Sequence, residues 1–191
     1  MKKHQKVFEL VKYTYENSQQ PFAKWMWKNH VPLVAQKTEE LSQQFHADGD
    51  LAIAGAWLHD FGDAFVHRHS DEHDEISRLQ AIKVLEESGY TVTEIDKILK
   101  EVIGPHSCKE GLLPDIVEGK VVATADALAH LTTDFYVQFA WMHLPDGLSY
   151  KEYLNWVKEK IDRDFNDKIF FQEIKEKFRY RYEALKEVFV K

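Results

Sequence analysis

Three residues of this sequence have the types and spacing that suit metal chemistry. His59 and Asp60 are adjacent and follow directly on an apolar run at residues 51–58, LAIAGAWL. Asp126 lies among small and apolar residues in VVATADALAHL. Imidazole and carboxylate together suit Fe, Mn, Co, Ni or Zn, and one carboxylate can bridge two ions. A buried carboxylate without a partner is costly, so Asp126 needs a cation, a hydrogen-bond network or a proton.

The neighbours of these residues indicate where helices end. Adjacent side chains on a regular helix point about 100° apart, so His59 and Asp60 can face one ion only where a helix ends or distorts. Gly62, just afterwards, is expected to supply that loosening. Pro32 fits best in the first turn of a helix, which places His30 at the helix start.

The elements that position these residues are predicted to be helices. Helical spacing of apolar residues recurs throughout the chain, whereas strong alternation of apolar and polar residues is hard to find. The pattern predicts helices at about residues 7–14, 31–41, 51–58, 72–88, 93–103, 116–131, 150–164 and 167–190. With 191 residues and no linker or repeat, we expect an all-α chain forming one domain, residues 1–191.

Composition limits the class of protein. The formal net charge of −7 argues against a broad basic surface for a long nucleic acid but allows a small anionic substrate at a local site. Cys108 is the only cysteine, so an intrachain disulfide is not possible. No apolar run approaches the ~20 residues that span a bilayer, and the start of the chain is too polar for a signal peptide. We therefore expect a cytoplasmic protein that does not bind a membrane.

The order of the histidines and acids resembles that of the HD superfamily of metal-dependent phosphohydrolases. Its signature is a His, a His-Asp pair and a distal Asp, and the matching positions are His30 in WKNHVPLV, His59 and Asp60 in GAWLHDFGD, and Asp126 in VATADALAH. Many members add two histidines for a second metal, at the places of His73 in HDEISRLQAIKVL and His106 in VIGPHS. The resemblance covers about residues 25–130, as a helical HD-domain bundle, and leaves about 133–191 as accessory helices.

The resemblance implies one or two divalent ions, chosen from Fe, Mn, Ni, Co, Mg or Zn. In the two-metal version His30, His59 and Asp126 hold one ion, His73 and His106 hold the other, and Asp60 lies between them. Asp60 and His106 are then the catalytic residues, although a single-metal site would leave His73 and His106 as substrate contacts or as a general acid. A metal lowers the pKa of bound water from about 15.7 towards about 7, which suits hydrolysis of a phosphoester in a nucleotide or other small phosphate compound.

One departure from the family concerns a cation. Some members carry a Lys three residues after the Asp of the pair, where this chain has Asp63. Four other cations lie close in sequence to the expected ligands and are candidates for binding substrate phosphate: Lys28, Arg68, Arg78 and Lys109.

Several other residues receive an ordinary structural interpretation. His67 and His69 are expected to be solvated in a polar loop that could cover the site, and His4, His46, His130 and His143 are taken as structural. Trp25, Trp27 and Trp57 could stack on a base but are expected in the core. Residues 162–168, DRDFNDK, are interpreted as a polar turn without a role in activity.

Two other functions stay open. A mixed-valence di-iron oxygenase uses the same helical frame and a similar set of six ligands, and a non-catalytic module could sense a nucleotide with the same fold. The expected partner is a small phosphorylated substrate, and a homodimer is left open.

Overall fold

The computed structural model describes residues 2–144 and 147–190, and these contain helices and no strand. The all-α prediction is therefore confirmed for this part of the chain. The α-helices are α1 (Lys3–Asn17), α2 (Ala23–Asn29), α3 (Val31–Gln44), α4 (Gly49–Leu58), α5 (His73–Glu87), α6 (Val92–Lys97), α7 (Val117–Thr132), α8 (Phe135–His143), α9 (Tyr150–Asn166) and α10 (Gln172–Phe189). Short 3₁₀ turns, η1 (Phe61–Ala64) and η3 (Lys109–Gly111), and a π-helical stretch, η2 (Ile98–Ile103), join them.

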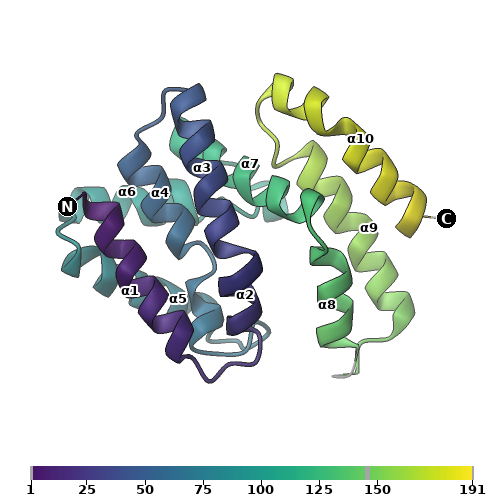
Figure 1. Cartoon of the computed structure of the whole chain (residues 1–191), viewed down its shortest axis with the longest axis horizontal. Helices are drawn as coiled ribbons and strands as arrows, with labels where there is room; N and C mark the ends of the chain where they lie inside the picture. The colour runs from purple at the N-terminus through teal and green to yellow at the C-terminus, as the bar shows by residue number, and fades with distance from the viewer. Residues whose placement is uncertain (1, 145–146, 191) are drawn as a thin grey trace.

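Helix α7 is the centre of the molecule. It packs against α3, α4 and η2 on one side and against α8, α9 and α10 on the other, as Figure 1 shows. Most of its residues are buried, in agreement with the small and apolar sequence around Asp126. Helix α4, also apolar nearly all round, lies between α1, α3 and α7. No helix in the described residues is both long and apolar enough to cross a membrane.

Local sequence signals fix several helix ends. Pro32 lies in the first turn of α3, as predicted. Gly89 ends α5 with a φ of +84°, a conformation that glycine adopts without strain. Helix α6 begins with a capping box in which the Thr91 hydroxyl and the Glu94 carboxylate each accept a hydrogen bond from the other residue's backbone N–H.

The polar turn predicted at residues 162–168 is wrong. Residues 162–166 continue α9, and the connection to α10 follows at 167–171. Asp164 and Lys168 are buried in this stretch, with exposed fractions of 0% and 2%. Their charges are satisfied by opposite charges inside the protein, so a polar sequence here reflects an internal ion-pair network rather than solvation.

A glycine on α4 permits close packing against the π-helical stretch. A Cβ on Gly55 would lie 2.5 Å from Cγ1 of Val102, a fully buried side chain. We predict that Gly55→Ala lowers the free energy of unfolding in urea by about 1–3 kcal/mol, because the overpacking outweighs the better helix propensity of alanine. Gly49→Ala on the same helix is the control: its Cβ would meet nothing closer than 3.8 Å, so it should not destabilise. Equal stability of the two variants would contradict the packing argument.

Candidate metal centre

Three of the four signature residues lie at helix boundaries, and the fourth lies inside a helix. His30 joins α2 to α3, and His59 follows Leu58, the last residue of α4. Asp60 follows with a φ of −122°, outside the helical range, so the chain turns between the two side chains as their adjacency requires. Asp126 lies inside α7. These positions are brought together although they are far apart in sequence.

Their ligand atoms converge. The Nε2 atom of His30 is 3.1 Å from Nε2 of His59, 3.2 Å from Oδ1 of Asp126 and 3.8 Å from Oδ2 of Asp60. The Nε2 atom of His59 is 3.5 Å from the same Asp60 oxygen and 3.7 Å from the Asp126 oxygen. All except Asp60 are almost completely buried, and Asp60 is 13% exposed.

The hydrogen bonds around the cluster leave lone pairs directed inward. Nδ1 of His59 donates to the Ala56 carbonyl at 2.7 Å, so in the neutral ring Nε2 is an acceptor. Oδ1 of Asp126 is buried and accepts no aligned hydrogen bond from the described residues. Burial alone would raise the pKa of Asp126, but His130 and Lys168 outweigh it and hold the pKa well below its usual value. An ionised carboxylate oxygen therefore lies 3.2 Å from two imidazole nitrogens without an aligned hydrogen bond.

The donor set fits a divalent ion. Around an ion bound at about 2.1 Å, neighbouring ligand atoms lie about 3.0–3.4 Å apart. The separations of 3.1–3.8 Å require only small shifts of side chains to reach that spacing. In the described residues, two overlapping groups of donors have ligand atoms that all lie within 4.8 Å of one another: one is His30, His59 and Asp60, and the other is His30, Asp126 and His130.

Comparison with known protein families agrees with this geometry. The sequence profile of the HD domain matches residues 28–131, more than half of the chain. The chain belongs to the HD domain family. No curated protein and no solved structure matches the chain. HD domains bind divalent metals and are generally metal-dependent hydrolases, and the buried His and Asp groups of this HD domain are placed to hold such an ion.

Some members carry a lysine three residues after the Asp of the His-Asp pair. This HD domain has Asp63 at that position, and Asp63 is paired with Arg68. Asp63 is 1% exposed, and Nη2 of Arg68 lies 2.5 Å from one of its oxygens and 2.6 Å from an oxygen of Asp60. Burial raises the pKa of Asp60, but Arg68 and His59 outweigh it and hold the pKa well below its usual value. Asp63 thus holds the guanidinium of Arg68, five residues further along the chain, beside Asp60.

The two extra histidines lie in the wall of the site without joining the donor groups. Nε2 of His73 is 3.0 Å from Asp63, and its Nδ1 is 3.1 Å from Asp74. A Cβ on Gly62 would lie 2.8 Å from the His73 ring, so Gly62 leaves room for this histidine in the 3₁₀ turn that follows α4.

His106 follows the π-helical stretch η2, a wide turn of a type often found at functional sites. Nδ1 of His106 donates to the Ile103 carbonyl at 2.5 Å, and its ring meets that of His59 edge-on, with 5.3 Å between the ring centroids. Burial lowers the pKa of His106 to about 4. His106 therefore stands as a neutral ring beside His59.

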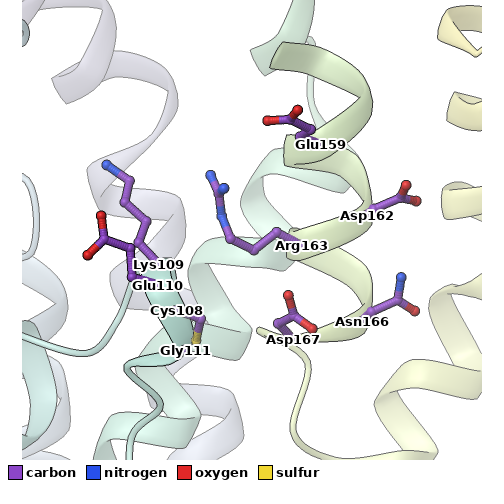
Figure 2. Close-up of a pocket in the computed structure, with 9 residues that line it drawn as sticks. All are labelled: Cys108, Lys109, Glu110, Gly111, Glu159, Asp162, Arg163, Asn166 and Asp167. Carbon is purple, nitrogen blue, oxygen red and sulfur yellow. The ribbon is translucent and has the colours of Figure 1, made fainter. Parts of the chain in front are cut away.

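A cavity of about 450 Å³ opens onto the cluster, a volume in the range of small-molecule sites. Among the predicted substrate-binding residues, Arg68, Arg78 and Lys109 line it, whereas Lys28 is exposed on α2 and does not. His69 is exposed, as predicted, and also lines the cavity. A second hollow of about 560 Å³ adjoins it and shares Lys109 and Arg163 with it. Figure 2 shows Arg163 extending from α9 towards the segment that carries Lys109.

Several cavity residues were missed by the sequence analysis because they come from outside the signature. Trp25, Trp27 and Trp57 pack in the core, as predicted, and the aromatic wall consists instead of Phe135, Phe139 and Trp156. His130, interpreted as structural, lies 3.2 Å from Oδ1 of Asp126 and four residues after it on the same helix. Lys160, Arg163 and Lys168 also line the cavity from the accessory region. The spacing of His130 from Asp126 is the one signal that could have identified it, since residues four apart share a helix face.

Proposed function

We propose that this HD domain protein hydrolyses a small phosphate ester with water activated at a divalent metal centre. The proposal depends above all on one observation: Oδ1 of Asp126 is buried without an aligned hydrogen bond, beside the Nε2 atoms of His30 and His59 and next to a cavity. An ion held there would lower the pKa of a water from about 15.7 towards about 7 and neutralise charge on a phosphate oxygen.

The protein's own residues then orient and retain the reacting groups. Asp60, clamped by Arg68 at 2.6 Å, offers its Oδ2 atom both to the imidazole cluster and to the cavity. His106 has its Nδ1 proton on the Ile103 carbonyl, so Nε2 is free to accept a hydrogen bond from the attacking water. Asp60 and His106 remain our candidates for the catalytic residues.

We further propose that one ion binds tightly rather than two. One of the two histidines expected to hold a second ion, His73, is bound to Asp63, and the Arg68 guanidinium bridges Asp63 and Asp60. A second dication in this region would meet the positive charge of Arg68. A site that binds only one ion tightly does not suit the di-iron oxygenase, which needs two ions.

The cavity wall favours a substrate with a phosphate and a flat ring, such as a nucleotide. Arg78, Lys109 and Arg163 line the cavity and make no ion pair with any described residue, so they are available to an anion. Phe139 and Trp156 stack on each other with 3.7 Å between the ring centroids and present an aromatic wall on the same cavity.

The test is a screen of purified protein, loaded with Mn, Co, Ni, Fe, Mg or Zn, against nucleotides and other phosphomonoesters and phosphodiesters. We expect phosphate release in anaerobic buffer and its loss in Asp60→Asn. Oxygen consumption during turnover would instead support the oxygenase. Nucleotide binding without turnover, under every metal tried, would support the sensing module.

The unpaired cations provide a sharper prediction. Lys109→Met and Arg163→Met should each raise KM about 10-fold or more, because a hydrogen bond to a charged group contributes about 1.5–3 kcal/mol. Metal affinity should not change, since neither residue contacts the donor cluster. Lys24→Met is the control, because Lys24 is an exposed lysine on α2 that does not line the cavity. Unchanged KM in both cavity variants would exclude this wall as the anion site.

A further inference from the structure

His130 lies against the donor cluster on the side of the accessory helices. Its Nε2 atom is 3.2 Å from Oδ1 of Asp126, and its ring is stacked on that of His30 with 5.0 Å between centroids and 4° between planes. The side chain is 4% exposed. Nε2 of His30, Oδ1 of Asp126 and Nε2 of His130 together form one of the two donor groups compact enough for a single ion.

The contact between His130 and Asp126 is not a hydrogen bond. Although the two atoms are 3.2 Å apart, Oδ1 of Asp126 accepts no aligned bond from any described donor. Lys168 pairs with the other oxygen of Asp126, so Oδ1 is the acceptor left without a bond, and a buried acceptor without a bond is costly. A cation bound by both atoms would satisfy them together.

The opposite edge of the His130 ring is held by a buried carboxylate from α9. Nδ1 of His130 is 3.1 Å from Oδ2 of Asp164, which is 0% exposed, and 2.9 Å from Nζ of Lys160. Asp164 is itself fixed by the hydroxyl of Tyr136 at 2.8 Å and by the ammonium of Lys160 at 2.5 and 2.7 Å. Metal-ligating histidines usually donate their second ring N–H to a carboxylate. The Lys160 ammonium already donates to both Asp164 oxygens, and in the tautomer whose Nδ1–H donates to Asp164 the lone pair of Nε2 points to the metal.

We propose that His130 is a further ligand of the metal, oriented by Asp164, so that accessory helix α9 completes the centre of the HD domain. The inference rests on the metal centre proposed above and extends its ligands to His30, His59, His130, Asp60 and Asp126. A set of three imidazoles and two carboxylates selects Fe, Mn, Co, Ni or Zn over Mg²⁺ and Ca²⁺, which prefer oxygen ligands throughout.

The test counts imidazoles around Co²⁺ bound to the whole protein, by X-ray absorption, together with Co²⁺ affinity from visible absorption titrations. We expect three imidazoles in the wild type, two in His130→Asn, and three in His106→Asn, because His106 lies outside the donor groups. Asp164→Asn should keep the count at three and weaken Co²⁺ binding about 10–100-fold. His4→Asn is the matched control: His4 also bonds a carboxylate, Asp50 at 2.6 Å, and it does not line the cavity.

The outcomes separate the two proposals. Two imidazoles in the wild type, or an unchanged count in folded His130→Asn, would overturn the role of His130 and leave the metal centre standing. A wild-type protein that binds no Co²⁺ would overturn both. If His130→Asn does not fold, a count of three in the wild type that persists in His106→Asn, His73→Asn and His69→Asn still assigns the third imidazole to His130.

Discussion

Replacing Asp126 by Asn is expected to abolish metal binding and hydrolysis together. Asp126 supplies the charged oxygen that His30, His59 and His130 surround. Loss of even a residue that supports a ligand weakens metal binding about 10–100-fold, so loss of the carboxylate itself should exceed about 100-fold. Phosphate release should fall at least as much at fixed metal concentration.

The same substitution should also reduce stability, because Asp126 has a second buried partner. Lys168, 2% exposed, binds the other oxygen of Asp126, and its next nearest carboxylate oxygen, on Asp164, is 3.8 Å away. Removing one partner of a buried ion pair costs about 3–5 kcal/mol. We expect a loss at the lower end of that range, since Asp164 still compensates part of the charge.

Thermal unfolding with and without Mn²⁺ or Co²⁺ measures both effects. An ion at 100 times its dissociation constant stabilises the wild type by about 2.7 kcal/mol, and the variant should show no such shift. Asp50→Asn is the control, because the carboxylate of Asp50 bonds His4 and does not line the cavity. A normal metal-dependent shift in Asp126→Asn would place the ion elsewhere.

The sequence predicted those residues of the site whose positions depend on their immediate neighbours in the chain. A His-Asp pair at the end of an apolar helix must sit where that helix stops, and a carboxylate within an apolar helix must find a cation, so His59, Asp60 and Asp126 could be identified directly. Helix α7 was expected to be buried for the same reason. The pattern of apolar spacing was sufficient for the all-α class, because it depends only on the helical period.

The part that could not be predicted depends on contacts distant in sequence. Lys168 and Asp164 look like solvated residues of a turn, and only packing of α9 against α7 shows that their charges compensate buried partners. His130 likewise looks structural until Asp164 is placed behind it. The sequence has Asp63 where some HD domains carry a lysine, so the site seemed to lack that cation. In the structure the guanidinium of Arg68 lies against Asp63 and supplies a positive charge.

Arg68 provides the second large effect that we expect. Arg68→Met should lower stability by about 3–5 kcal/mol in metal-free buffer, because it leaves the buried carboxylate of Asp63 and the nearby Asp60 without their shared cation. It should also raise the number of bound ions from one towards two at high metal concentration, since Asp63, Asp60 and His73 then have no guanidinium beside them. Urea unfolding and elemental analysis after equilibrium dialysis measure the two quantities.

Arg78→Met is the control for the Arg68 variant, because Arg78 also lines the cavity yet makes no ion pair with a described residue. Its stability should stay within about 0.5 kcal/mol of the wild type, as for most surface substitutions, and its ion count should stay at one. Arg68→Lys keeps the charge but loses the forked geometry of the guanidinium, so it should retain one ion with intermediate stability. Two tightly bound ions in the wild type would refute the single-ion proposal, because Arg68 would then not exclude a second dication.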